Sequence, residues 1–453
     1  MPGGAPLTAG AAPSPGPAAR RAAGTPRSRR RRRATSPNTM SSILRAFALA
    51  AAALGAAGAH AATTITLATF PDVDRAAKAV LPRWHAEHPD IDVKIVSLQY
   101  ADHHNQMTTD LATGSYLPDV MAVDFKFIGK FMGSGGFEDL NQPPYGAGAL
   151  RAAFPPYTLA QATNAKGELG ALPADIGPGT FLYRADLVAK AGLTEADFTK
   201  DWASFIAAGI KLKAATGACI LASSNDVVDI VLRSDLPAGE GIYFDRDGKV
   251  LVGDARFVRA FELGRAAHRA GIDAGTTMWT NEWVAGFRSG RIAGQMMGSW
   301  LAGHLKNWLA PDTAGKWRSA PLPGGVYASY GGSFYAIPRR AAHKAEAWAF
   351  IRFLTADRQN QLDALREFGN FPSLIAAQQD AVVAAPIAFL GGQPAGVLWR
   401  DIAAKVPAVP VDKYDSMATD AVRAEYENVI TDGKDIHAAL ADAKWLIEHR
   451  ARR

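Results

Sequence analysis

The feature that most limits how this chain can fold is an alternation of strand-like and helix-like segments that begins near residue 65. Residues 65–70 are apolar and rich in β-formers, and apolar residues then recur at helical spacing from Val73 to Trp84. Residues 91–95 alternate between apolar and charged side chains, as a half-buried strand does. A β-α-β unit of this kind pairs its strands in parallel through a right-handed crossover. The sequence therefore predicts an open α/β domain.

The same alternation continues toward the C-terminus. A helix over 102–113, a strand over 119–124 and a short helix over 127–134 follow, and the helices become longer past Pro173. Ligands bind beyond the carboxyl ends of the strands in open α/β sheets. The sequence therefore predicts binding-site residues in three segments, which are 69–74, 99–102 and 124–127.

The excess positive charge of the chain is confined to its first 61 residues. The 453 residues have a formal net charge of +6, but residues 1–61 hold nine arginines, no lysine and no acidic residue. Without these nine positive charges the net charge is about −3, and no block of like charges remains. Electrostatic attraction to DNA or RNA therefore has no basis, and we expect no nucleic-acid partner.

The first 61 residues also have the plan of a secretory signal peptide. From Met40 a short basic start leads into an alanine-rich apolar stretch, residues 46–58, and then into an A-x-A cleavage motif at residues 59–61. We expect translation to begin at Met40 and cleavage to follow Ala61, because residues 1–39 are too rich in Pro, Gly, Ala and Arg to pack a core. No lipid-attachment cysteine follows, and no later apolar run is long enough to span a bilayer. The mature protein is predicted to be soluble and periplasmic.

The chain carries no sequence motif of an enzyme active site. No G-x-S-x-G, H-E-x-x-H, Walker A or G-x-G-x-x-G pattern occurs, so we predict no catalytic residue and no cofactor. His85, His88 and the sequence Asp102-His103-His104 could together ligate zinc. Exposed histidines are the more ordinary interpretation of this spacing, and we predict no metal site.

One of the ten tryptophans stands apart from the others. Most are expected to pack in the core, and four of them, Trp84, Trp202, Trp348 and Trp445, lie within helical patterns. Trp300 instead follows a Gly-Ser pair at the end of an apolar run, where an aromatic ring can face a cleft. Because a flat indole presents an electron-rich face to sugar C–H groups, Trp300 points to a carbohydrate site.

Seven ordered segments resemble family 1 extracellular solute-binding proteins, the group that includes maltose-binding protein. Their order and spacing extend over nearly all of residues 62–453. They are a helix and strand at 84–93, an "A-x-G-x-x-P-D-V"-like segment at 112–120, a "G-x-x-x-D-L"-like segment at 135–140, a first crossing at 172–193, an "F-x-x-G-x-x-A … G-x-W"-like block at 287–300, a second crossing at 331–338 and a loop at 368–373.

The resemblance implies an α/β, two-lobed periplasmic binding protein fold of the type II kind, whose lobes are joined by three crossing segments with a hinge. The N-terminal lobe would comprise residues 62–172 and 331–354, and the C-terminal lobe residues 173–330 and 355–453. Such a protein captures a mono- or oligosaccharide between its lobes and delivers it to the permease subunits of an ABC transporter in the inner membrane. We expect a monomer without enzymatic activity.

The resemblance also implies particular ligand contacts. Asp124 and Asp175 would accept hydrogen bonds from sugar hydroxyls, and Trp300 would stack on a sugar ring. Gly331 and Gly332 would let the backbone approach the ligand. The other candidates are Lys126, Tyr330, Asn370 and Phe371, and the second stacking aromatic could be Tyr414 or Phe371.

Two other kinds of function stay open on the sequence. The same architecture could bind a polyol, a polyamine, or iron or zinc, because acids and aromatics in a cleft suit a polyamine as well as a sugar. A secreted glycan-acting enzyme is the less favoured alternative, since scattered carboxylates could form a glycosidase pair.

Overall fold

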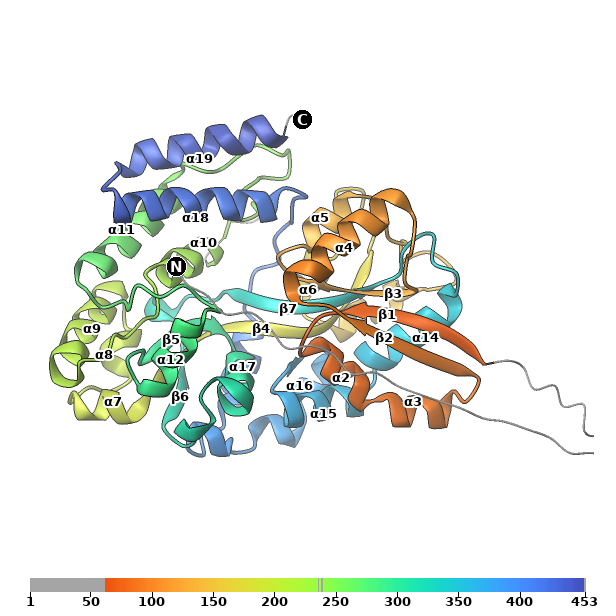
Figure 1. Ribbon diagram of the computed structural model, residues 1–453, viewed down its shortest axis with the longest axis horizontal. Helices are drawn as coiled ribbons and strands as arrows, with labels where there is room; N and C mark the ends of the chain where they lie inside the picture. Colours follow the sequence, from red (N-terminus) through yellow and green to blue (C-terminus); the bar gives the residue numbers. More distant parts are fainter. Residues whose placement is uncertain (1–61, 235, 238, 452–453) are drawn as a thin grey trace, which may run out of the picture. The chain divides into compact units, whose positions relative to one another are not determined.

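The structure is a computed structural model that describes residues 62–451 except 235 and 238 (Figure 1). The predicted leader and its cleavage site therefore lie outside the described residues. No helix within the described ranges is both long enough and apolar enough to cross a membrane.

The N-terminal part contains the predicted β-α-β unit. Strand β1 (Thr63–Thr69) pairs in parallel with β2 (Ile91–Ser97) and with β3 (Val120–Asp124). The helical segment between β1 and β2 divides into α2 (Val73–Ala79) and α3 (Leu81–Glu87), with Val80 at the junction. Pro82 lies in the first turn of α3, where its missing N–H leaves no hydrogen bond unmade.

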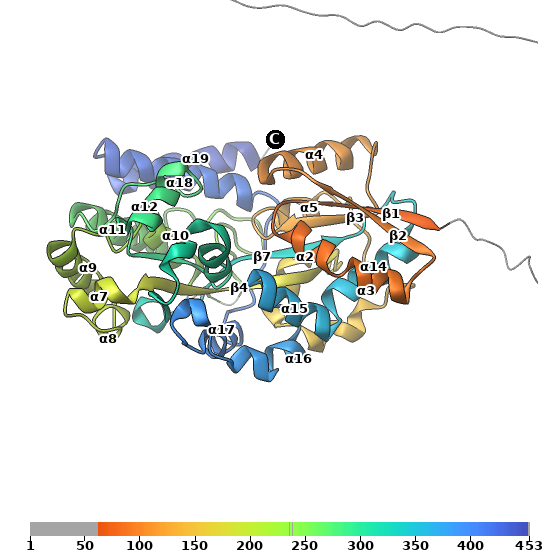
Figure 2. The same ribbon diagram turned by 60° about the horizontal axis from the view of Figure 1, so that its bottom comes forward.

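Two long strands connect the two halves of the sheet. Strand β4 (Ala171–Arg184) pairs antiparallel with β7 (Ser329–Ala336) along its first half, and with β5 (Gly294–Gly298) and β6 (Trp317–Ala320) along its second half. Strand β7 also pairs with β3, which gives the order β2-β1-β3-β7-β4-β5. Both views show β4 and β7 side by side (Figure 1 and Figure 2). The sheet is therefore mixed, because the crossing strands run antiparallel to their neighbours.

Apolar side chains gather in two separate clusters. The N-terminal core draws on residues 65–172 and 334–377 and includes Trp84 and Phe350. The C-terminal core draws mainly on residues 176–330 and 371–447. Its largest fully buried rings are Trp283, Trp317, Trp399, Tyr157 and Tyr426.

The lobe boundary predicted after residue 354 stays a prediction, and the packing gives a reason to move it. Leu362 of α15 (Arg358–Phe368) and Ala377 of α16 (Ile375–Gln378) pack in the N-terminal core. We therefore place both helices with the N-terminal lobe.

Trp84, Trp202 and Trp348 are buried, as predicted, but the prediction for Trp445 is wrong. Trp445 lies on α19 (Ile436–Ala451) and is 59% exposed. The buried stripe of this helix runs through Ile436, Ala439, Leu440, Ala443 and Ile447, and Trp445 falls outside that stripe.

Helices cover the sheet and complete the C-terminal part. Helices α18 (Asp415–Thr431) and α19 pack side by side and contact α11 (Ala255–Arg269) (Figure 1). The remaining helices are α4 (Tyr100–Thr113), α5 (Ile128–Gly133), α6 (Pro156–Gln161), α7 (Ala185–Lys190), α8 (Ala196–Thr199), α9 (Trp202–Thr216), α10 (Asn225–Arg233), α12 (Asn281–Ser289), α13 (Leu301–His304), α14 (Lys344–Thr355) and α17 (Ala395–Ala403), and a short strand β8 (Phe371–Pro372) pairs with β4.

Candidate functional site

Trp300 is anchored on the crossing strands. Its indole Nε1 donates a hydrogen bond to the Tyr330 carbonyl oxygen over 2.8 Å. A Cβ atom at Gly177, Gly298 or Gly331 would overlap this same nitrogen, so three glycines leave the space that the indole edge fills. The ring is half-buried, and the hydrogen bond and the three glycines hold its indole edge in place.

The two glycines predicted to lie at the ligand, Gly331 and Gly332, have structural contacts that the sequence did not indicate. Gly331 has φ +89° and lies against Trp300, and Gly332 has φ +120° and lies against the Asp175 carbonyl oxygen. Their predicted role in admitting a ligand to the backbone stays a prediction.

Replacing Gly331 by alanine is expected to lower the free energy of unfolding by about 1–3 kcal/mol, because alanine is strained at this φ and its Cβ displaces the indole. Gly315→Ala is the matched control. Gly315 has a similar φ of +81° but no neighbour within 4 Å of its added Cβ, so it reports the backbone strain alone. Urea unfolding of both variants measures the difference. Equal decreases in the free energy of unfolding would show that the indole moves aside without destabilising the fold.

A second tryptophan that the sequence did not single out lies beside Trp300. The Trp279 and Trp300 rings are 15° from parallel, with centroids 6.0 Å apart. Trp279 is 54% exposed and has φ +70°, a conformation that costs a bulky residue about 1–3 kcal/mol. Strained, exposed aromatics of this kind occur at ligand clamps. Trp279 is therefore our candidate for the second stacking aromatic.

The structure does not bring the two predicted alternatives to Trp300. Phe371 has no exposed surface and packs edge-on against Trp399, with ring centroids 5.8 Å apart, so its prediction as a stacking residue is wrong. Tyr414 contacts Phe244 and lies instead on a cavity between α5 and α18.

His304 extends the aromatic surface and faces a carboxylate from the N-terminal part. Trp308 Nε1 lies 3.0 Å from His304 Nδ1, and an indole N–H can only donate, so Nδ1 accepts and Nε2 carries the proton. That Nε2 lies 3.5 Å from Asp72 Oδ2. Burial lowers the pKa of His304, which keeps the imidazole neutral. Asp72, in the predicted segment 69–74, also pairs with Arg75 over 3.0 Å and has φ +72°.

The two predicted carboxylates lie on either side of one residue. Asp124 ends β3 and Asp175 lies in β4, and both are register partners of Ser333 in β7. Residues directly opposite each other in antiparallel pairs project from the same face, so the carboxylates share a face of the sheet. Asp124 Oδ1 accepts from Tyr100 Oη over 2.8 Å, and Asp175 Oδ1 accepts from the Ser333 amide over 2.8 Å.

Burial is the main cause of a raised pKa at both carboxyl groups of this pair. It raises the pKa of Asp124 to about 6, and the pKa of Asp175 also to about 6. The charge of Asp175 adds to the rise at Asp124. Both groups are therefore largely ionised at pH 7 and can accept hydrogen bonds from hydroxyls.

Tyr330 is held in an ionic network. Its hydroxyl donates to Asp229 Oδ2 over 3.1 Å, and Arg423 of α18 donates to the same oxygen. The Arg233 guanidinium lies 5.0 Å from the Tyr330 ring centroid and 5.1 Å from that of Phe125. Tyr330 is only 7% exposed, so the structure assigns it to this network, and its ligand contact stays a prediction.

Asp226, one turn before Asp229 on α10, is a polar residue that the sequence did not indicate. Its side chain is 1% exposed, and both carboxylate oxygens lack a hydrogen-bond partner. Burial raises its pKa well above the ordinary value, and the charge of Asp229 adds to the rise. Arg423 Nε and Arg233 Nε are also buried without partners. Buried polar groups are usually hydrogen-bonded, and an ordered water can serve as the partner of such atoms.

Lys126 pairs with a residue that lines one cavity, and Asn370 itself lines another. Lys126 Nζ donates to Asp420 Oδ1 of α18 over 2.8 Å. Asn370 lines a small cavity of about 30 Å³ together with Asp175 and Gln361. A polar cavity of that volume holds a water molecule rather than a sugar ring.

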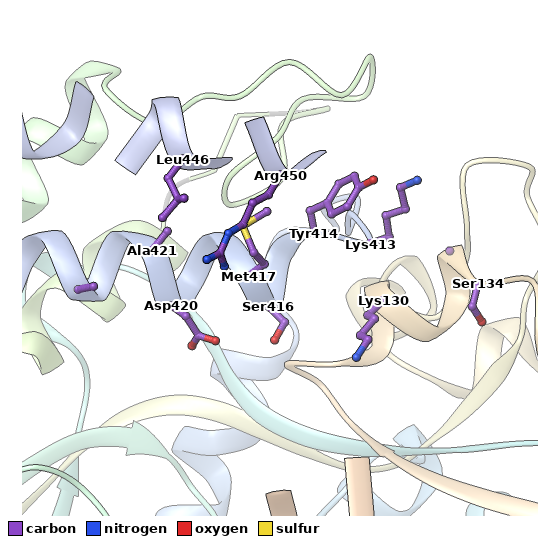
Figure 3. Close-up of a pocket in the computed structure, with 12 residues that line it drawn as sticks. Lys130, Ser134, Lys413, Tyr414, Ser416, Met417, Asp420, Ala421, Leu446 and Arg450 are labelled. Carbon is purple, nitrogen blue, oxygen red and sulfur yellow. The ribbon is translucent and has the colours of Figure 1, made fainter. Parts of the chain in front are cut away.

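A larger cavity of about 760 Å³ lies beyond Lys126. Figure 3 shows α5 on one side of it and helices α18 and α19 on the other. Its size falls in the range of small-molecule sites, about 300–1,000 Å³. It is lined by Lys130, Gly133, Ser134, Lys413, Tyr414, Ser416, Met417, Asp420, Ala421, Ala424, Leu446 and Arg450.

The histidines considered for zinc have other partners. His103 and His104 are 2% and 1% exposed, so our interpretation of them as exposed was wrong. His103 Nε2 contacts the Ala122 carbonyl oxygen and His104 Nδ1 that of Tyr100, each over 2.7 Å. Across the described ranges, no three His, Cys, Asp or Glu residues are grouped so that they could hold a metal ion.

Comparison with known proteins identifies a family whose members resemble this chain. The family described as bacterial extracellular solute-binding protein matches residues 79–390. A lactose-binding protein of Rhizobium radiobacter is 29% identical over 367 residues, which cover 78% of this chain and 84% of that protein.

Solved structures share the fold. A family 1 extracellular solute-binding protein superposes with a TM-score of 0.75 at 24% identity, covering 85% of this chain and 99% of that one. A binding protein from B. animalis subsp. lactis in complex with β-1,6-galactobiose gives 0.72 at 20% identity, covering 85% and 97%. MalE of Xanthomonas citri gives 0.71 at 22%, with the same coverage. These likenesses confirm the predicted α/β, two-lobed fold, and the family match shows that the chain belongs to the bacterial extracellular solute-binding proteins.

Proposed function

We propose that this protein captures a mono- or oligosaccharide between its two lobes and delivers it to the permease subunits of an ABC importer. The observation that carries the proposal is the parallel Trp279–Trp300 pair beside His304. Two near-parallel indoles offer flat, electron-rich faces of the kind that sugar C–H groups contact. The lactose-binding relative and the galactobiose complex support a sugar as the ligand.

The carboxylates supply the polar half of such a site. An ionised carboxylate can accept two hydroxyl hydrogen bonds, and bonds to a charged acceptor are stronger than neutral ones. Asp124 and Asp175 share a face of the sheet, so together they could hold several hydroxyls of one ring. This combination of acids and indoles is the reason to favour a sugar over an apolar ligand.

Closure of the lobes would complete the site. Asp72 and Lys126, on the N-terminal side, contact His304 and Asp420 on the C-terminal side. Strands β4 and β7 run between both halves and provide the segments about which such a fold hinges. We propose further that the protein acts in the periplasm, as a monomer and without catalysis.

A polyamine is the second candidate ligand. Ammonium groups bind to carboxylates and to indole faces, so Asp124, Asp175 and Trp279 would suit a polyamine as well. A glycan-acting enzyme would also need one carboxyl group as acid and one as nucleophile or base on either side of a scissile bond. Asp124 and Asp175 instead project from the same face of one sheet.

Thermal unfolding of residues 62–453 with different ligands tests the proposal. A ligand at about 100 times its Kd adds about 2.7 kcal/mol to the free energy of unfolding, so its addition raises the Tm. We expect lactose, galactobiose or another neutral sugar to raise the Tm, and chromatography of the mixture to show intact sugar. A rise with spermidine or a metal ion alone would contradict the proposal, and hydrolysis products would establish an enzyme.

A further inference from the structure

Asp124 is held by a closed set of hydrogen bonds with helix α4. The Tyr100 hydroxyl donates to Asp124 Oδ1 over 2.8 Å, and the Asp124 amide donates to His104 Nε2 over 3.2 Å. A backbone amide can only donate, so Nε2 accepts and His104 Nδ1 carries the proton. That Nδ1 donates to the Tyr100 carbonyl oxygen over 2.7 Å, which closes the set. Burial lowers the pKa of His104 to about 3, so the imidazole stays neutral in this role.

Aromatic packing holds the Tyr100 ring that carries the hydroxyl. The ring meets Phe70 edge-on, with centroids 5.6 Å apart, and its centroid lies 5.9 Å from that of Phe127. The Phe127 ring in turn stacks on His104, with centroids 4.2 Å apart. Tyr100 is nevertheless 40% exposed, so it lies at the surface of the site and not in the core. The packing therefore aims an accessible tyrosine at Asp124.

The two carboxylate oxygens of Asp124 are not equally free to bind a ligand. Oδ1 accepts from both the Tyr100 hydroxyl and the Lys126 amide, over 2.8 and 2.9 Å. A carboxylate oxygen has about two lone-pair directions, so these two donors occupy Oδ1. Oδ2 accepts from no donor in the described part of the chain, and Asp124 is only half-buried. Oδ2 is therefore the oxygen left for a ligand hydroxyl.

We propose that Tyr100 is a positioning residue of the sugar site, which reserves Oδ1 of Asp124 and presents Oδ2 to a sugar hydroxyl. The inference rests on the proposed function, because the ligand that Oδ2 receives is the sugar. A hydrogen bond to the charged form of an acid favours that form, so the Tyr100 hydroxyl opposes the rise that burial causes in the pKa of Asp124. Without this hydroxyl, Asp124 should take up a proton at a higher pH and lose its charged acceptor.

Titration of the Asp124 carboxyl in the absence of sugar tests the effect on Asp124. We expect Tyr100→Phe to keep the ring packing and to raise the midpoint by about one pH unit, the scale of one charge-assisted hydrogen bond. Carbon-13 NMR of aspartate-labelled protein measures the midpoint, and Asp124→Asn assigns the signal. The other titratable groups around Asp124 and Tyr100, which the variant leaves unchanged, are His104, Lys126, Asp175, Tyr330 and Arg423.

The pH dependence of lactose affinity tests the effect on the sugar site. With its midpoint about one pH unit higher, Tyr100→Phe should bind lactose about fivefold more weakly than the natural protein at pH 6, and equally well at pH 8. A tyrosine hydroxyl that bonded to the sugar directly would change the affinity by the same factor at both pH values. Calorimetry that gave such a constant factor would contradict a positioning role.

Tyr116→Phe is the matched control, because it removes the same hydroxyl from a side chain that is 94% exposed. We expect this variant to change neither the Asp124 midpoint nor the lactose affinity at any pH. Melting curves of both variants check that they fold.

The outcomes separate this inference from the proposed function. An unchanged Asp124 midpoint in Tyr100→Phe would overturn the inference while sugar binding stands. If neither lactose nor galactobiose binds, the proposed function fails, whereas the midpoint still decides whether Tyr100 controls the charge of Asp124.

Discussion

Replacing Trp300 by alanine is expected to weaken sugar binding by about 2 kcal/mol, roughly 30-fold in Kd, which is the scale of a central aromatic contact. The loss has two parts, because the variant removes the stacking face and leaves the Tyr330 carbonyl oxygen without its indole donor. Loss of the indole donor also lowers the free energy of unfolding by about 1 kcal/mol. Calorimetry with the best sugar from the thermal screen measures the first part, and urea unfolding measures the second.

Trp279→Gly separates stacking from folding. Glycine adopts the φ of +70° that strains Trp279, so this variant should lose affinity while its stability is unchanged or higher. Trp445→Ala is the control, because Trp445 is exposed on α19 and its ring contacts His449, and it should change neither quantity. Full sugar affinity in both Trp300→Ala and Trp279→Gly would remove the basis of the proposed site.

The different fates of these tryptophans show what local sequence can and cannot predict. Trp300 was predictable because it follows a Gly-Ser pair at a strand end, and β5 indeed ends one residue before Ser299. Trp279 precedes a helix with no distinguishing pattern, and its ring becomes a partner of Trp300 only through the tertiary fold. Trp445 matched a helical pattern, but a pattern does not say which face of the helix meets the core.

The position of Asp124 could be predicted from the sequence, but its proximity to Asp175 could not. Alternation of strands and helices predicted the strand that ends at Asp124 and the site at such ends. Only the pairing of β3 and β4 with the same strand, β7, shows that Asp124 and Asp175 share a face. The ionic partners Asp229 and Arg423 are 194 residues apart in the chain, a separation that no local pattern spans.

Lowering the pH from 7 to 5 is expected to weaken sugar binding and to stabilise the fold at the same time. Asp124 and Asp175 both have a pKa of about 6, so each is about nine-tenths protonated at pH 5 and loses its charged acceptor. Affinity should fall about tenfold for each carboxylate that must be ionised. Calorimetry at a series of pH values measures this fall.

The effect on stability has the opposite sign. An acid whose pKa is raised by folding binds more protons in the native state than in the unfolded state between its ordinary value of 3.8 and about 6. Its contribution to the free energy of unfolding therefore decreases as the pH rises through that window. Asp124→Asn/Asp175→Asn should be more stable than the natural protein at pH 7, bind sugar more weakly, and show a flatter pH dependence in both properties. The buried Asp415, with a pKa raised to about 7, titrates in both proteins, so only the difference between them reports the pair. If the sugar affinity of the natural protein is constant from pH 7 to 5, neither carboxylate contacts the ligand in its ionised form.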